Sequence, residues 1–237
     1  MKPRDREEEL RQAGLDFSSK PHRPSGFQRR AGTPPAPGEL AGAEFLRFVG
    51  EIDDLENLER FALECSRCHL RSGCKGVVFG EGSPRAQIAF VGEAPGADED
   101  RLGRPFVGRA GKLLDRIIDA CGLLRDEVYI TNIVKCRPAA NRTPTEEERN
   151  YCIPYLHAQM RLVRPGVLVS LGAAATQGLI RPDAKITRMR GTWQEWRGIK
   201  VMPTFHPAAL LRDPRKRPPV WEDMKSVLEE LGLRGPA

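Results

Sequence analysis

Short, mostly apolar runs recur along the chain, and segments with helical periodicity separate them. A strand inside a parallel sheet has this pattern because both of its faces are covered. The runs that predict strands are 87–91, 128–134 and 167–171, and a further pair, 193–196 and 199–205, predicts a hairpin across Arg197 and Gly198. Strands that alternate with helices indicate an α/β fold, with a central, mostly parallel sheet in a three-layer α/β/α arrangement.

The segments between the runs have the spacing of amphipathic helices. In 111–120, the Leu and Ile side chains fall on one helical face. Thr145 and Glu148 have the spacing of a capping box, which predicts that a long helix starts there and runs toward Val163. Two further helices are expected, at 173–179 and 220–231.

The first part of the chain lacks both kinds of period. Residues 1–50 mix charges of both signs with the Pro-rich stretch 34–38, and we expect them to form a disordered N-terminal extension. The folded domain is expected over 51–237, and it begins with a helix near Leu55 that leads into Cys65.

Composition narrows the class of protein. The chain has 237 residues with 38 Lys and Arg against 32 Asp and Glu, a net charge of +6, which suits a polyanionic partner but does not establish one. No run of 18 apolar residues is present, so no transmembrane helix is expected. The charged start has no apolar stretch typical of a secretory signal, so we expect a cytoplasmic protein.

Four of the six cysteines form a pattern, in which Cys65 and Cys68 make a C-x2-C pair and Cys136 and Cys152 follow as C-x15-C. In the cytosol such a pair indicates metal binding or redox activity. Four thiolates can close a zinc site or hold an iron–sulfur cluster, and the spacing does not separate these two. An interpretation of equal weight is that Cys136 and Cys152 are small residues of the hydrophobic core. Of the remaining cysteines, one continues the apolar face of 111–120 and one lies in a loop where it can replace a ligand: Cys121 and Cys74.

Candidate ligand-binding residues follow the predicted strands directly, where open α/β sheets bind their ligands. After the first strand, the Gly-Glu-Ala-Pro-Gly turn 92–96 can present backbone N–H groups and Glu93 to a ligand. Asn132 follows in the second strand, and it either caps a turn or reads a base edge with its paired donor and acceptor. Phe106 lies in the Gly- and Pro-bounded loop 103–108, where a core plug and a stacking surface are equally good interpretations.

The segment after the last strand carries a histidine and a basic run. A single histidine such as His206 is more often structural than functional, so it does not define a site alone. Arg212, Arg215 and Lys216 form either a solvated loop or a surface that holds phosphates. In the second case Leu210 would serve as an apolar wedge between bases.

Together these motifs closely resemble the family 4 uracil-DNA glycosylases, the iron–sulfur branch of that superfamily. The resemblance extends from about Leu55 to Leu231, and the first 50 or so residues lie outside it. It rests on the four cysteines in register and on GEAPGADEDRLGRPFVGRAGKLLD (92–115), TNIVKCRPAANRTPTEEE (131–148) and FHPAALLR (205–212). Jointly these motifs are highly specific.

The resemblance implies a DNA-repair enzyme that hydrolyses the N-glycosidic bond of uracil in DNA and leaves an abasic site. It implies a [4Fe–4S] cluster rather than zinc, with a structural role, since this hydrolysis needs no redox step. The expected partner is uracil-containing DNA, single- or double-stranded, with no membrane involved, and the protein is expected to be a monomer. The implied cluster ligands, which leave the other two cysteines free, are Cys65, Cys68, Cys136 and Cys152.

The resemblance also implies roles for the residues at the strand ends. A uracil inside a duplex is unreachable and must be flipped out. Phe106 would then stack on the base, and Asn132 would accept from N3–H and donate to O4. His206, with backbone N–H groups of the 93–95 loop, would stabilise the charge that develops on O2. Uracil would also contact Glu93, Ala94 and Pro95, and DNA would contact Leu210, Arg212, Arg215 and Lys216.

Two positions depart from the best-known branch of the superfamily. Ala94 stands where that branch has an Asp that acts on the water nucleophile, and Gly96 stands where it has a Tyr that excludes the methyl group of thymine. Both departures belong to the family 4 pattern. Glu93 is the nearest carboxylate, and we expect it to contact the substrate rather than activate water. Thymine must then be rejected elsewhere in the pocket, by Glu93 or Phe106.

Three alternatives remain. A related branch captures uracil-DNA covalently through a His in an inserted basic loop, but the stretch 137–143 has neither an insert nor a His. A non-catalytic metalloprotein or phosphate-binding domain would release no uracil. The third alternative keeps the fold and shifts the base range toward hypoxanthine or mismatched thymine.

Overall fold

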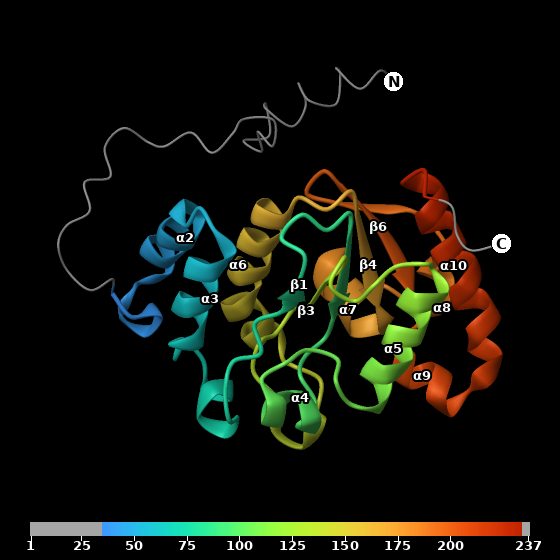
Figure 1. Cartoon of the computed structure of the whole chain (residues 1–237). Helices are drawn as coiled ribbons and strands as arrows, with labels where there is room; N and C mark the ends of the chain where they lie inside the picture. Colours follow the sequence, from blue (N-terminus) through green and yellow to red (C-terminus); the bar gives the residue numbers. More distant parts are fainter. Residues whose placement is uncertain (1–34, 234–237) are drawn as a thin grey trace.

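The computed structural model describes residues 35–233, which form one six-stranded sheet covered by helices on both faces (Figure 1). The strand order is β1-β3-β2-β4-β6-β5. The four inner strands are parallel, and the two edge strands, β1 and β5, are antiparallel to their neighbours. This confirms the predicted three-layer α/β/α fold. The strands are β1 (Glu81–Gly82), β2 (Ile88–Gly92), β3 (Tyr129–Asn132), β4 (Val167–Leu171), β5 (Gln194–Trp196) and β6 (Ile199–Thr204).

Alternate residues of the buried strands enter two separate cores. In β2, Ala89 and Val91 pack into one core, whereas Ile88 and Phe90 pack into the other. Helices α2, α3, α6 and α7 cover the first face, and α5, α9 and α10 cover the second (Figure 1). The helices are α2 (Gly42–Glu51), α3 (Leu55–Leu63), α4 (Ala97–Leu102), α5 (Arg109–Ala120), α6 (Glu146–Val163), α7 (Gly172–Leu179), α8 (Ile186–Met189), α9 (Pro207–Arg212) and α10 (Arg217–Glu230), with 3-10 turns η1 (Pro37–Glu39), η2 (His69–Gly73), η3 (Ala139–Asn141) and η4 (Pro214–Lys216).

Local sequence signals account for several element ends. The Thr145 hydroxyl accepts from the Glu148 N–H at 3.2 Å, and the Glu148 carboxylate accepts from the Thr145 N–H at 2.7 Å, so the predicted capping box is confirmed. The β5–β6 hairpin is also confirmed. Its turn residues Arg197 and Gly198 have φ of 51° and 77°, the left-handed pair that a two-residue hairpin turn requires. Helix α10 starts three residues before the predicted Val220, because prolines are tolerated in a first helical turn.

The folded domain begins earlier than the predicted residue 51. Helix α2 lies within the expected extension, and its Phe45 and Val49 are 1% and 2% exposed. Phe45 meets the edge of the Tyr155 ring on α6 at a centroid distance of 5.4 Å. The apolar residues of α2 have helical spacing, so the sequence contained this signal. The rest of the predicted extension, residues 1–34, lies outside the described residues.

Across residues 35–233, none of the helices has the length and apolar character needed to span a membrane.

Candidate active site and metal centre

The strand-end residues meet at one edge of the sheet. Gly92 at the end of β2 is paired in register with Asn132 at the end of β3. His206 follows β6, whose parallel orientation brings its carboxyl end to the same edge. The ligand-binding edge expected for an open α/β sheet therefore carries Gly92, Asn132 and His206, which lie in three of the segments that the sequence singled out.

Asn132 is buried, 2% exposed, and its side-chain oxygen Oδ1 has no hydrogen-bond partner among the described residues. Buried polar atoms without a partner are rare, because an unmade hydrogen bond costs about 1–3 kcal/mol. The unpaired oxygen is thus an acceptor available to a ligand.

Phe106 and His206 lie beside this acceptor. A Cβ atom built on Gly92 would overlap Asn132 Oδ1 and would lie 2.5 Å from Cζ of Phe106, so both side chains converge above Gly92. The Phe106 and His206 rings are 5.6 Å apart at their centroids and are tilted by 33°. The structure therefore brings Asn132, Phe106 and His206 together. Phe106 is 5% exposed, so it also packs as a core residue, which agrees with the core-plug interpretation.

His206 is held as a neutral imidazole. It is the N-cap of α9, and its Nδ1 accepts a hydrogen bond from the Ala208 N–H at 3.1 Å. Burial, together with the positive charge of Arg212, lowers the pKa of His206 to about 4. A neutral ring that accepts at Nδ1 carries its proton on Nε2, so Nε2–H is the free donor.

Glu93 is half-buried in the loop after β2. Burial raises the pKa of its carboxyl above the usual range, whereas a hydrogen bond with Thr143 and the positive charge of Arg149 oppose the rise. In the same loop Ala94 is partly buried and Pro95 is buried. Because Pro95 has no N–H, only Glu93 and Ala94 can supply the backbone donors expected from 93–95.

Glu99 joins the loop after β2 to the loop that carries Phe106, a role that the sequence pattern did not reveal. Its carboxylate accepts from the N–H groups of Gly96 at 3.1 Å and of Val107 and Gly108 at 2.9 Å each. The loop after β2 is therefore joined to the loop that carries Phe106. The position of Glu99, three residues after Gly96, has the spacing of a capping box and was the available signal.

Lys135 was also missed. Its side chain is fully buried below β3, and Nζ donates to the Asn132 carbonyl at 2.6 Å, to Thr131 Oγ1 at 2.7 Å and to Gln159 Oε1 at 2.6 Å. Burial lowers the pKa of Lys135 to about 7, and negative charge on Cys152 opposes this change. The bond to the Asn132 carbonyl holds the backbone at this residue, and the other two bonds fix the position of the ammonium group.

The predicted DNA-contacting residues separate into two groups. Leu210 is 1% exposed and packs in the core of the α5–α10 face, so the structure does not place it where a wedge must lie. Its neighbour Leu211 is 39% exposed. Arg212 is exposed at the end of α9. Arg215 and Lys216 also reach solvent, and both form ion pairs with Asp213, at 2.9 Å and 3.5 Å.

The four cysteines of the predicted pattern line a single cavity between the loop after α3, the end of β3 and α6. Burial raises the pKa of Cys136 and, to about 12, that of Cys152. Buried thiols become thiolates when a metal centre is bound. Cys74 lies beside Cys136 and donates to the Gly76 carbonyl at 3.4 Å, but it is not one of the residues that line this cavity.

Other features of this cavity suit an anionic sulfur-rich group. The Lys135 N–H donates to Cys152 Sγ at 3.2 Å, a bond that stabilises a thiolate. Arg67 lies between the two cysteines of the C-x2-C pair, and its buried Nε lacks a hydrogen-bond partner among the described residues. Over residues 35–233, no three His, Cys, Asp or Glu side chains are grouped closely enough to hold a metal ion.

Comparison with known proteins identifies the superfamily to which this chain belongs. A family model described as the Uracil DNA glycosylase superfamily matches residues 79–229, which contain all six strands. A type-4 uracil-DNA glycosylase of Sulfurisphaera tokodaii is 44% identical over 187 residues, which cover 75% of this chain and 85% of the relative. A type-4 enzyme of Thermotoga maritima is 49% identical over 154 residues, 63% of this chain and 79% of the relative. A type-4 enzyme of Archaeoglobus fulgidus is 41% identical over 193 residues, which cover 78% of this chain and 97% of the relative. The chain therefore belongs to the uracil DNA glycosylase superfamily and, within it, to the type-4 family, as predicted from the sequence.

Proposed function

We propose that this protein excises uracil from DNA by hydrolysing the N-glycosidic bond, which releases the base and leaves an abasic site. The observation that carries this proposal is the buried, unpaired Oδ1 of Asn132 beside Phe106 and His206. A flipped uracil supplies the missing donor, its N3–H. Its flat face matches the Phe106 ring, and its O2 can accept from His206.

Base recognition follows from the amide of Asn132. Oδ1 accepts from N3–H of uracil, and the amide nitrogen donates to O4. Cytosine presents the reverse pattern, an acceptor at N3 and a donor at N4, so it would leave both amide atoms of a buried site unpaired. Such sites reject a base that lacks the correct donor strongly. The polar groups of the site and of the base lose their water, and no hydrogen bond between them offsets this cost.

Bond cleavage gives uracil the electron pair of the N1–C1′ bond. A water oxygen bonds to C1′ and loses a proton to solvent, and the departing uracil anion carries much of its charge on O2. The neutral His206 donates from Nε2–H to this oxygen, and the N–H groups of Glu93 and Ala94 are further candidate donors. Donors already in place stabilise the charge as it develops, without reorganising solvent.

Glu93 acts as a substrate contact in this mechanism. Its raised pKa reflects burial in the loop that faces the base, and the superfamily position for a water-directing Asp is occupied here by Ala94. In this proposal the carboxyl holds the uracil edge and the loop, and water from solvent captures the oxocarbenium-like sugar.

Arg212, at the end of the helix that His206 caps, is the proposed contact to the DNA backbone, and Arg215 and Lys216 extend the positive surface. Leu211 rather than Leu210 is the proposed wedge, because an inserting side chain must be exposed before it can enter the base stack.

The proposed cofactor is a [4Fe–4S] cluster held by Cys65, Cys68, Cys136 and Cys152. When bound, it supplies a cross-link between three distant segments and takes no part in hydrolysis. The support for it is the shared cavity, the N–H bond to Cys152 and the unpaired donor of Arg67.

The test is incubation of the purified full-length chain with single-stranded DNA that contains one uracil. We expect free uracil and an alkali-labile abasic site, with no release from matched thymine or cytosine strands. A complex that survives denaturation would instead support covalent capture. Absence of both products would support a non-catalytic binding protein. Parallel substrates with hypoxanthine or mismatched thymine measure the base range.

A further inference from the structure

The backbone at Phe106 needs external support. Its φ is 50°, in the left-handed region that residues other than glycine seldom occupy. Such a conformation persists only where the surroundings determine it, and it often occurs at ligand sites. Pro105 precedes Phe106 directly, so a contact that fixes the Pro105 carbonyl also constrains the direction of the Phe106 ring.

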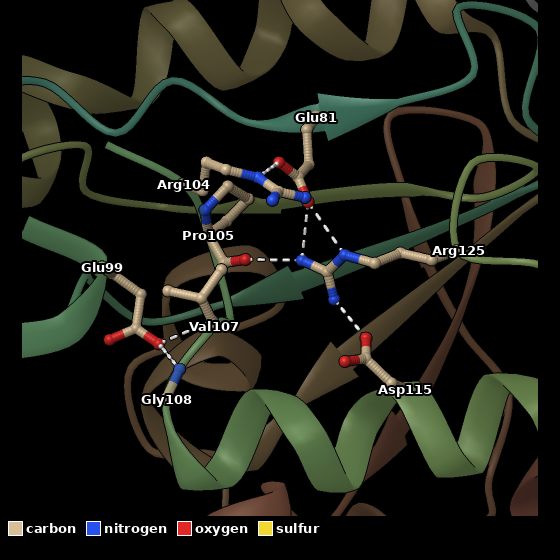
Figure 2. A network of polar contacts seen from close by, with 8 residues as sticks. All are labelled: Glu81, Glu99, Arg104, Pro105, Val107, Gly108, Asp115 and Arg125. Carbon is tan, nitrogen blue, oxygen red and sulfur yellow. Dashed lines mark hydrogen bonds and ion pairs between the residues drawn. The ribbon is translucent and has the colours of Figure 1, made fainter. Parts of the chain in front are cut away.

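Arg125 holds the Pro105 carbonyl from outside the uracil site. Its Nη2 donates to this oxygen at 2.6 Å (Figure 2). Arg125 lies in the segment between α5 and β3, twenty residues from the loop it contacts, and its side chain is 23% exposed. No step of the proposed reaction uses it.

Two carboxylates fix the guanidinium in turn. Glu81 Oε1 accepts from Arg125 Nε at 2.8 Å, and Asp115 on α5 forms an ion pair with Nη1 (Figure 2). Glu81 also accepts from Arg104 at 2.7 Å and 3.0 Å, so it holds the Phe106 loop by a second route. A planar fork with its donors engaged at three acceptors is a rigid support, which a lysine cannot reproduce.

The support is anchored to the strand that reads the base. Glu81 is on β1 and pairs with Ile130 of β3, and β3 ends at Asn132. The chain of contacts runs from β3 through Glu81 and Arg125 to Pro105. It therefore fixes the position of the Phe106 ring relative to Asn132 from the side opposite Glu99.

We infer that Arg125, held by Glu81 and Asp115, is a positioning residue that sets the Phe106 ring at stacking distance from the uracil read by Asn132. This inference rests on the proposed function. Arg125 touches neither the base nor the DNA; it acts through the Pro105 carbonyl and the backbone of Phe106.

A double-mutant cycle tests this route, because two residues that act through each other give non-additive effects. The variants are Arg125→Gln, Phe106→Ala and the pair, with uracil release measured as kcat and KM on single-stranded DNA. We expect Arg125→Gln to lower kcat/KM about tenfold when Phe106 is present, since small misplacements of a positioning group are costly. In the Phe106→Ala background the same change is expected to lower kcat/KM less than about twofold, because the residue through which Arg125 acts is then absent.

Two further variants guard against a general loss of stability. Arg125→Lys keeps the charge without the planar guanidinium. We expect its kcat/KM to lie between that of the wild type and that of Arg125→Gln. Arg181→Gln removes an exposed ion pair with Asp183 and is the matched control, expected to match the wild type. Hydrogen exchange of the peptide 103–108 supplies a readout that does not depend on activity, and we expect faster exchange of this segment alone in Arg125→Gln.

The outcomes separate the two proposals. A wild-type protein that releases no uracil overturns the proposed function. A wild-type protein that is active, with equal losses for Arg125→Gln in both backgrounds or with unchanged exchange of 103–108, overturns the positioning role and leaves the function standing.

Discussion

The Nδ1 atom of His206 accepts a hydrogen bond from the backbone N–H of Ala208, two residues later in the chain, at 3.1 Å. This contact caps α9 and at the same time selects the tautomer of the imidazole. Because Nδ1 is an acceptor and the ring is neutral, the proton lies on Nε2, and Nε2–H is left as the donor of this ring. A helix cap therefore determines which hydrogen bond the site can offer to a developing negative charge.

The first prediction concerns the pH dependence of stability. The pKa of His206 is lowered to about 4 by burial and by Arg212, so between about 4 and the ordinary value near 6.5 the unfolded chain binds a proton that the folded chain does not. The free energy of unfolding must then rise with pH across this window. The contribution of His206 is present in full above about 6.5 and is lost as the pH falls from there to about 4. Urea unfolding of the wild type and of His206→Gln at pH 4 to 8 measures this contribution.

His157 contributes in the same window, since burial and Arg197 lower its pKa to about 4 as well. The difference in the free energy of unfolding between the wild type and His206→Gln isolates the contribution of His206. This difference should become smaller toward acid pH. NMR titration of the His206 ring gives a direct check. A midpoint near the ordinary value of about 6.5 would contradict the lowered pKa of this buried ring.

Asn132→Ala should separate activity from stability. The change removes a buried acceptor that has no partner, so we expect little or no loss in the free energy of unfolding. Uracil release should fall by roughly 5- to 150-fold, because a bidentate contact to a base edge contributes about 1–3 kcal/mol. Steady-state kinetics and urea unfolding on the same preparation test both parts. A large drop in stability with a proportionate drop in activity would indicate a structural role.

Gly92→Ala should close the space between the site residues. The added Cβ would overlap Asn132 Oδ1 and reach 2.5 Å from the Phe106 ring, so one of these side chains must move. We expect uracil excision to fall at least tenfold, on the order expected when catalytic groups are misplaced by about 1 Å. Gly50→Ala is the matched control, since nothing lies within 4 Å of its added Cβ. Wild-type activity in Gly92→Ala would show that the site is roomier than this packing implies.

Iron content should distinguish the cysteines. Cys152→Ser is expected to lose most bound iron and its thiolate–iron absorbance, because this side chain lines the shared cavity. Cys121→Ser serves as the control. Its thiol is buried in the opposite core, so the change should lower stability and leave the iron content unchanged. Purified wild-type protein that is colourless and loaded with zinc would overturn the cluster. Loss of iron in Cys74→Ser would place that residue among the ligands.

Leu210 and Leu211 should fail in different ways. Leu210→Ala is expected to destabilise the fold by about 2–5 kcal/mol, as for other buried leucines. Leu211→Ala should leave stability nearly unchanged and reduce excision from double-stranded DNA more than from single-stranded DNA, because only the duplex presents a stack that must be opened. Thermal unfolding and excision from both substrates are the measurements. Equal losses on the two substrates would contradict a wedge at Leu211.

Much of the architecture was predictable from local sequence. Periodicity placed the strands that end at Gly92 and Asn132, and the Thr145–Glu148 spacing placed the start of α6, because these signals depend on residues close together in the chain. Helix α2 was not predicted, because the Pro-rich stretch before it is typical of an extension. This helix is stabilised by packing of Phe45 against Tyr155, which is distant in the chain. The motifs also named Asn132, Phe106, His206 and the four cysteines as candidates.

Only the tertiary structure decided how these residues act together. The unpaired oxygen of Asn132, the neutral state of His206 and the burial of Leu210 depend on contacts between segments far apart in the chain. The same holds for Lys135 below Asn132 and for Arg125 behind Phe106. Burial and hydrogen-bond satisfaction are properties of the packed environment, so a residue type and its spacing can indicate a site, whereas its protonation, exposure and support follow from the fold.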